Sequence, residues 1–259
     1  LSGPIVPGIL SAQASVNYYT YGGEYTNHAP GRASDGETIG QEKTVGGSLA
    51  LRFTPTANLA FTLRGSYAEN DDGHEPMAMQ RSGANNCYLN RPTQYYCGAI
   101  NVTPDMIGLN LEEIGGGGVE RETSRVSLVG EYDWNAYVFT SITGYNDSYE
   151  NRKADLDYQP TRLLGGSLHA ADRIAIESFS QEFRVASPTD GRLHWLAGTY
   201  YFNSDTWTGR YRYIGGAQQN NGTVHVKNLA AFGLVGFDFT DRLAGTAELR
   251  LAEEELHLD

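Results

Sequence analysis

The stretch Thr44-Val45-Gly46-Gly47-Ser48-Leu49-Ala50-Leu51-Arg52-Phe53 decides the fold, because its side chains alternate in character. Val45, Gly47, Leu49, Leu51 and Phe53 fall on one side, and the more polar set falls on the other. Successive side chains of a β-strand point to opposite faces, so this pattern predicts a strand with one apolar face and one polar face. After the turn at 55–58 the alternation resumes from Leu59, which predicts a second, antiparallel strand.

The same character recurs along the chain. The sequence predicts nine strands, at residues 9–18, 44–53, 59–67, 124–132, 137–145, 178–186, 193–202, 227–239 and 243–251. Short connections at 55–58, 133–136, 187–192 and 240–242 alternate with long ones at 19–41, 69–122, 147–176 and 203–226. Short turns at one end and long loops at the other are typical of outer-membrane barrels, in which the long loops face outward. The predicted fold is an all-β, antiparallel up-and-down meander that forms part of a large transmembrane β-barrel.

Composition is consistent with a wide barrel. The chain of 259 residues is only 40% hydrophobic, with a mean hydropathy of −0.43 and 17 tyrosines. A barrel needs one apolar face per strand and tolerates a polar lumen. Aromatic residues gather at the predicted strand ends, as in the interfacial girdles of such barrels, although β-propensity alone also favours aromatic residues in strands. They are Tyr18, Tyr19, Tyr21, Phe53, Tyr132, Trp134, Trp195, Tyr200, Tyr201, Phe202, Phe237 and Phe239.

Several functions are not expected. The net charge of −12 argues against nucleic-acid binding, which needs a basic surface. The six histidines are scattered without metal-ligand spacing, so no metal site is expected. No Ser/His/Asp or Cys/His arrangement points to an enzyme, and no cofactor is implied. Four consecutive glycines at 115–118 do not connect a strand to a helix, so a flexible loop is expected rather than a phosphate cradle.

Cys87 and Cys97 lie within the long polar connection at 69–122. Two cysteines in a polar loop predict a disulfide in an oxidising compartment, the alternative being two free thiols.

Two hairpins resemble a known family. Residues 228–233, 236–243 and 246–250 read Asn-Leu-Ala-Ala-Phe-Gly, Gly-Phe-Asp-Phe-Thr-Asp-Arg-Leu and Thr-Ala-Glu-Leu-Arg. Residues 179–187 read Phe-Ser-Gln-Glu-Phe-Arg-Val-Ala-Ser, and 195–201 read Trp-Leu-Ala-Gly-Thr-Tyr-Tyr. Both resemble barrel hairpins of TonB-dependent outer-membrane receptors, and Ser2-Gly3-Pro4-Ile5 resembles the passage from plug to first barrel strand. One departure is Glu248-Leu249-Arg250-Leu251, where the family usually has Gly-Leu-Arg-Tyr.

The resemblance implies a function and a location. Members of the family lie in the bacterial outer membrane and bind scarce ligands such as ferric siderophores, haem, cobalamin or oligosaccharides. The TonB complex pulls on a plug inside a barrel of about 22 strands. We therefore expect residues 1–259 to be the N-terminal portion of such a barrel, with the plug and the remaining strands outside this stretch. The expected partners are outer-membrane lipid, the TonB complex through the plug, and an extracellular small-molecule ligand.

Two sets of residues are candidates for contact with that ligand or with the plug. In the long loops, aromatic residues beside arginines suit anionic or sugar-like ligands; they are Arg81, Tyr88, Arg91, Tyr95, Tyr96, Trp207, Arg210, Tyr211, Arg212 and Tyr213. On the predicted lumen face, charged residues could hold the plug or line a solute path, or could simply pair across strands. They are Arg52, Arg64, Arg125, Glu131, Glu182, Arg184, Glu248 and Arg250.

Two other functions remain open from the sequence. A passive porin-like channel would use the same strands without a separate plug. A soluble β-rich carbohydrate-binding protein would bury Leu49, Leu63, Leu128 and Leu249 together between two layers.

Overall fold

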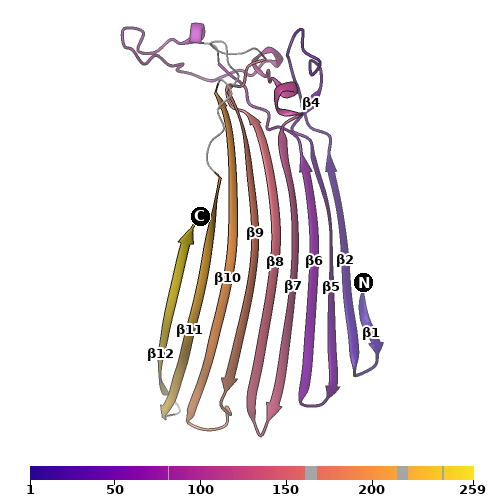
Figure 1. Cartoon of the computed structure of the whole chain (residues 1–259), viewed down its shortest axis with the longest axis vertical. Coiled ribbons are helices and arrows are strands. Elements are labelled where there is room, and N and C mark those ends of the chain that lie inside the picture. The colour runs from indigo at the N-terminus through magenta and orange to yellow at the C-terminus, as the bar shows by residue number, and fades with distance from the viewer. Residues whose placement is uncertain (81, 161–167, 215–220, 241) are drawn as a thin grey trace.

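The computed structural model describes residues 1–80, 82–160, 168–214, 221–240 and 242–259. Within that part of the chain, ten strands form one antiparallel sheet in the order β1-β2-β5-β6-β7-β8-β9-β10-β11-β12 (Figure 1). β3 and β4 form a separate two-stranded pair. Every other strand is hydrogen-bonded to the sheet strands that come before and after it in sequence, so the sheet is an up-and-down meander. Figure 1 shows the short turns at one end of the sheet and the long loops at the other.

The strands of the sheet are long, apart from the first. They are β1 (Ser2–Val6), β2 (Leu10–Tyr21), β5 (Glu42–Thr56), β6 (Leu59–Asp72), β7 (Gly118–Trp134), β8 (Tyr137–Asp155), β9 (Leu168–Ala186), β10 (Leu193–Ile214), β11 (Asn221–Thr240) and β12 (Leu243–Leu258). The small pair is β3 (Tyr25–Thr26) and β4 (Thr38–Ile39), and three short 3-10 helices are η1 (Ser82–Ala84), η2 (Pro104–Met106) and η3 (Leu111–Ile114). Among the described residues no helix has both the length and the apolar character needed to cross a membrane.

All nine predicted strands are confirmed, and a tenth was missed. The tenth, β1, is an edge strand of five residues that pairs with β2 from Ser2 opposite Gln13 to Val6 opposite Leu10. Pro4 lies within β1 and Pro7 follows it. Proline cannot donate to a strand ladder and is tolerated on an edge. The five residues of β1 read Ser-Gly-Pro-Ile-Val and show no alternation of apolar and polar side chains, which is why the sequence did not identify this strand.

The prediction of long loops at 147–176 and 203–226 was wrong. β8 continues to Asp155, β9 begins at Leu168, β10 continues to Ile214 and β11 begins at Asn221. The pairing runs on through a row of polar partners, in which Asp147 lies opposite Glu177 and Glu177 opposite Asp205. The predicted strands were too short because the alternation of apolar and polar side chains ends at this polar row. Backbone hydrogen bonding does not depend on that alternation, so the strands continue beyond it.

The two faces of the sheet differ as the alternation predicts. Directly opposite residues share a face, and Ala12, Leu51, Leu63 and Leu128 form one such row across β2, β5, β6 and β7. Leu49, Leu63, Leu128 and Leu249 are 47%, 40%, 42% and 66% exposed, respectively. Among the described residues no second layer covers them, so this part of the chain does not form the apolar core that the soluble alternative requires.

Aromatic side chains form two bands on this apolar face. Near the short turns, Phe53 pairs with Phe61, and Tyr132 pairs with Phe139. Farther up the sheet, Tyr145 lies opposite Phe179, whose ring is 6.4 Å from that of Tyr201. On β5, β6 and β7, leucine, valine and glycine fill the zone between the bands, which matches an apolar belt between aromatic girdles, whereas β8 and β9 place Ser141, Thr143 and Gln181 on the same face. Not every candidate joins the bands, because Tyr200 and Phe202 stack on the opposite, polar face.

A charge placed between the two bands tests which face meets hydrocarbon. In the intact protein in lipid bilayers, we expect Leu128→Arg to lower the free energy of unfolding by about 2–4 kcal/mol, the cost of a cation near the bilayer midplane. The control Thr140→Arg adds the same charge on the polar face, opposite Glu131 and Arg184, and is expected to have little effect. Equal losses in the two variants, measured by denaturant unfolding, would contradict the assignment of the faces.

Candidate functional site

Three segments at one end of the sheet, residues 22–41, 73–117 and 156–160, form what we call the loop layer (Figure 1). Its centre is a small apolar core of Ile39, Ile107, Leu109, Leu111 and Ile114, with Ala78 and Tyr158 packed against it. All five core side chains are buried. The three segments therefore share one hydrophobic cluster and do not fold as independent loops.

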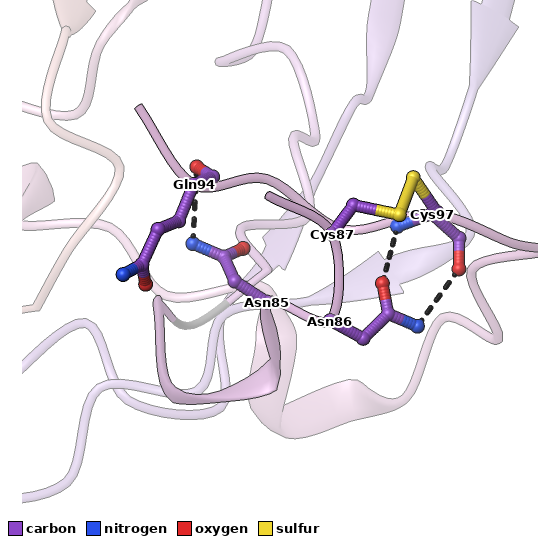
Figure 2. The surroundings of a disulfide bond; sticks show 5 residues. All are labelled: Asn85, Asn86, Cys87, Gln94 and Cys97. Carbon is purple, nitrogen blue, oxygen red and sulfur yellow. Dashed lines mark hydrogen bonds between the residues drawn. A yellow bond between two sulfur atoms is a disulfide. The ribbon is translucent and has the colours of Figure 1, made fainter. Parts of the chain in front are cut away.

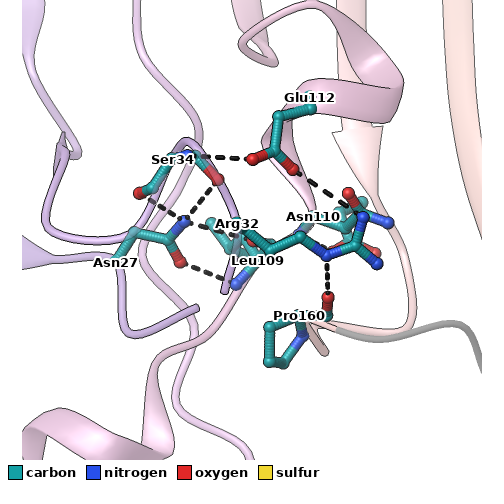
Figure 3. A network of polar contacts seen from close by, with 8 residues as sticks. Asn27, Arg32, Ser34, Leu109, Asn110, Glu112 and Pro160 are labelled. Carbon is teal, nitrogen blue, oxygen red and sulfur yellow. Dashed lines mark hydrogen bonds and ion pairs between the residues drawn. The ribbon is translucent and has the colours of Figure 1, made fainter. Parts of the chain in front are cut away.

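A buried amide joins the first two segments (Figure 3). Asn27 is 1% exposed, and its Nδ2 donates to the carbonyls of Ser34 and Leu109, each at 3.1 Å. The N–H of Leu109 returns a hydrogen bond of 2.7 Å to Oδ1 of Asn27. Both ends of the amide are satisfied, so the side chain acts as a fixed clamp across 82 residues of sequence.

A carboxylate and a guanidinium extend this network to the third segment (Figure 3). The N–H of Ser34 donates to Glu112 at 2.9 Å, and Arg32 lies 4.0 Å from the same carboxylate. Arg32 Nε donates to the carbonyl of Pro160 at 2.9 Å. The N–H of Ser34, more than any other group, holds the pKa of Glu112 below its ordinary value. Glu112 is therefore anionic at neutral pH and completes the link.

His74 and Asp155 form a second buried link, between β8 and the middle segment. His74 Nε2 accepts a hydrogen bond of 2.9 Å from the N–H of Asp155, while Nδ1 is 2.8 Å from the carbonyl of Glu75. The imidazole is therefore neutral, with its proton on Nδ1. Asp155 Oδ2 in turn accepts from the N–H of Asn110 at 2.8 Å. Burial lowers the pKa of His74 and raises the pKa of Asp155 to about 6.

The four glycines at 115–118 lead from η3 through a tight turn into the first residue of β7. All four have positive φ, a conformation that side chains other than glycine rarely adopt. A Cβ at Gly117 would lie 2.8 Å from His74 Cδ2, and one at Gly118 would lie 2.0 Å from the carbonyl oxygen of Asp72. The run therefore brings the chain into close contact with its neighbours, and the predicted flexibility of this loop stays a prediction.

Cys87 and Cys97 are joined in a disulfide within the middle segment (Figure 2). The side chain of Asn86 binds the backbone of Cys97 at both ends of its amide. Its Oδ1 accepts a hydrogen bond from the N–H of Cys97 at 2.7 Å, and its Nδ2 donates to the carbonyl of Cys97 at 2.9 Å. The backbones of Cys87 and Tyr95 also bond to each other. We call residues 87–97 the disulfide hairpin.

Aromatic and cationic side chains gather on the disulfide hairpin. The rings of Tyr88 and Tyr95 are 5.1 Å apart, and the guanidinium of Arg91 lies 5.3 Å from the centre of the Tyr88 ring. Tyr88 is 52% exposed and Tyr95 is 48% exposed. Tyr96 is less exposed and donates its hydroxyl to the carbonyl of Ala99 at 3.0 Å. Tyr88, Arg91 and Tyr95 together offer stacking faces beside a positive charge, which suits an aromatic or anionic ligand.

The remaining loop candidates lie elsewhere. Trp207 and Arg210 are on β10 and not in a loop, and Arg210 Nε donates to Asp172 at 2.8 Å. Tyr211, Arg212 and Tyr213 are also on β10, where the structure describes the backbone alone, and Arg81 lies outside the described residues. In the described part of the chain, no hydrogen bond, ion pair or ring contact joins Trp207 or Arg210 to the disulfide hairpin. The ten loop residues predicted to contact the ligand therefore do not form one group, because some lie on the disulfide hairpin and others on β10.

The three segments of the loop layer also border a hollow that no motif predicted. It has a volume of about 630 Å³, and its walls include His28, Pro30, Met79, Met106, Tyr158 and Pro160. These residues come from all three segments of the loop layer, and none belongs to a recognisable motif. A hollow of this size is within the range of small-molecule sites.

The eight charged residues predicted for the lumen all lie on the polar face, as the strand register requires. Arg52 is 3.9 Å from Glu131, and Arg184 pairs with Glu182. The guanidinium of Arg250 lies 5.4 Å from the ring centre of Tyr200. Among the described residues no cluster of three or more histidine, cysteine or acidic side chains has the geometry of a metal site.

Comparisons with known proteins locate the fold. No protein-family model matches the chain, and a search of curated proteins gives no match. The structure is similar to the ferric yersiniabactin uptake receptor FyuA from Yersinia pestis, with a TM-score of 0.65 and 15% identity over 99% of this chain and 40% of that one. It is also similar to the siderophore receptor PirA from Acinetobacter baumannii, with a TM-score of 0.62 and 14% identity over 99% of this chain and 36% of that one.

A third similar structure is the ferripyoverdine receptor of the outer membrane of Pseudomonas aeruginosa bound to ferripyoverdine, with a TM-score of 0.66 and 15% identity over 99% of this chain and 35% of that one. The chain thus spans two-fifths or less of the length of these receptors. At this level of identity the likeness establishes the fold, which resembles the barrel part of such receptors, and confirms the predicted partial β-barrel.

The disulfide is expected to stabilise the hairpin and not the sheet. Replacing both cysteines with serine in the intact protein removes a small-loop closure worth about 2–3 kcal/mol. Chymotrypsin should then cleave faster after Tyr88, Tyr95 and Tyr96, while the thermal unfolding of the sheet is unchanged. Asn85→Ala, which removes one hydrogen bond of 3.3 Å to Gln94, is the matched control. Identical cleavage of all three proteins would refute the prediction.

His74 and Asp155 are expected to give the loop layer opposing pH responses. The lowered pKa of His74 favours the neutral ring, so its contribution is present above about pH 6.5 and is lost as the pH falls. The folded-state pKa of Asp155, about 6, exceeds the ordinary value, so its contribution grows as the pH falls below 6. Between pH 7 and 5, protection of the amides of residues 109–114 from hydrogen exchange should therefore rise in His74→Gln and fall in Asp155→Asn. Parallel pH profiles in the two variants would contradict this assignment.

Proposed function

We propose that residues 1–259 are the N-terminal portion of the β-barrel of a TonB-dependent receptor in the bacterial outer membrane. The observation that carries the proposal is the single-layer meander with exposed leucines between two aromatic bands, because such a face is typical of a barrel wall that meets hydrocarbon. The sheet is also open, so β1 and β12 each have one strand neighbour in the described chain. Further strands of a barrel would pair with both edges, and a plug would occupy the lumen.

The ligand that we propose is a ferric siderophore. The three similar receptors described above are named for siderophores or for their complexes, and all are similar over nearly the whole of this chain. The disulfide hairpin supports an anionic or aromatic ligand, because Tyr88, Arg91 and Tyr95 present stacking faces and a cation at the exposed end of the molecule. In this proposal the TonB complex supplies energy through the plug, the apolar face contacts outer-membrane lipid, and the protein is a transporter and not an enzyme.

Uptake by the full-length protein tests the proposal. A strain that lacks its own siderophore receptors would express it and be supplied with a panel of ⁵⁵Fe-labelled siderophores. We expect accumulation of at least one of them, abolished by deletion of TonB. Uptake that persists without TonB would favour the passive channel, and the absence of uptake for every siderophore would remove the proposed ligand class.

The hairpin residues are tested with the ferric siderophore that is taken up. Loss of stacking and of the cation should cost about 1–2 kcal/mol, so the variant Tyr88→Ala with Arg91→Ala is expected to bind about tenfold or more weakly. Thr93→Ala, in the same exposed turn, is the control and should bind normally. Binding is measured by fluorescence quenching of the purified receptor. Equal affinities would separate the hairpin from the ligand site while leaving the transport function intact.

A further inference from the structure

Most arginines of the polar face have a carboxylate partner on that face or in the loop layer above it. Besides the pairs of Arg52 and Arg184, Arg121 Nε donates to Glu150 at 2.8 Å, Arg210 bonds to Asp172, and Arg152 is 3.3 Å from Glu75. Arg250 has the Tyr200 ring instead. The face is therefore organised so that its cationic side chains are locally neutralised or stacked.

Arg64 on β6 and Arg125 on β7 depart from this pattern. Arg64 lies opposite Ser127, and Arg125 lies opposite Ser66, so the two arginines are diagonal neighbours on one face. Arg125 Nε donates to the amide oxygen of Asn146 at 3.1 Å, which supplies no charge. Among the described residues, Arg64 has neither a hydrogen bond nor an ion pair. Arg64 and Arg125 are thus neighbouring cations, and neither has a carboxylate partner among the described residues.

Both arginines border a hollow of about 460 Å³ on the polar face. Around it the side chains are short, including those of Ser48, Ala50 and Ser66, and no acidic residue lines it. Serine hydroxyls can donate hydrogen bonds, and the short side chains leave the two guanidinium groups accessible from the lumen side. The hollow is thus shaped to admit a group that the described chain does not itself provide.

We propose that Arg64 and Arg125 form a subsite for a carboxylate. Two adjacent cations repel one another, and enclosure in a barrel would strengthen that repulsion by reducing screening. A carboxylate removes the repulsion and accepts paired hydrogen bonds from a planar guanidinium. Because this face lines the barrel interior only if the chain is part of a barrel, the subsite rests on the proposed function. The carboxylate belongs either to an acidic side chain of the protein's own plug or to a solute that enters the lumen.

Citrate is the probe for a carboxylate that comes from solution. It is titrated by calorimetry into the full-length protein in detergent, and into the variant Arg64→Gln with Arg125→Gln. The matched control is Arg184→Gln, which removes a cation of the same face that already has a carboxylate partner. A solute subsite predicts that citrate binds to the unmodified protein and the control, with at least tenfold weaker binding to the double variant.

A photo-crosslinking residue at Ser127 tests the other source. If the plug supplies the carboxylate, citrate does not bind, and the crosslinked peptide contains an aspartate or glutamate whose neutralisation reproduces the effect of the double variant on thermal unfolding. The proposal is overturned if citrate binds no better to the unmodified protein than to the double variant and no acidic peptide is crosslinked. Siderophore uptake is measured on the same proteins, so loss of the subsite with intact uptake is distinguishable from failure of the proposed function.

Discussion

For the membrane barrel proposed above, backbone hydrogen bonding in hydrocarbon is the constraint on which the structure depends. Water is absent from the interior of a bilayer, so each N–H and C=O there must find a partner in the protein. A meander satisfies these groups strand against strand, and here the ladders run without a shift through all 17 pairs of β7 with β8 and all 19 pairs of β9 with β10. Since the backbone is satisfied by pairing alone, side chains are free to serve the two environments on either side of the sheet.

That separation explains which parts of the fold could be predicted. Residues 44–53 identify a strand because hydrocarbon and a hydrated lumen impose opposite demands on successive positions. The upper part of β10 carries no such signal, since Asp205 and Ser204 on opposite faces are both polar. Beyond the apolar belt both faces meet water, so the alternation vanishes while the ladder continues. The length of the strands past this point is therefore a property of pairing between segments and not of any one segment.

The loop layer was less predictable for a related reason. Its core residues Ile107, Leu109 and Leu111 alternate along one short stretch of sequence, yet Ile39 comes from a distant segment and completes the cluster. Asn27 is an unremarkable residue in sequence and becomes a clamp only because Leu109 lies beside it. The hydrophobic core usually found inside a domain is located here in the loops, since the sheet directs its own leucines outward. Sequence could suggest that Tyr88 and Arg91 belong together, because only three positions separate them within one closed hairpin.

Order in the loop layer has a consequence for recognition. A ligand that contacts freely moving loops has to offset the conformational entropy lost when they become fixed. In this chain the Asn27 clamp, the Glu112 network and the disulfide are contacts within the loops that need no ligand to form. The exposed rings of Tyr88 and Tyr95 are then mounted on a hairpin whose shape is already determined. The disulfide that closes this hairpin thus reduces the entropic cost of binding at the two rings, which links the covalent structure of the loop to the function proposed for it.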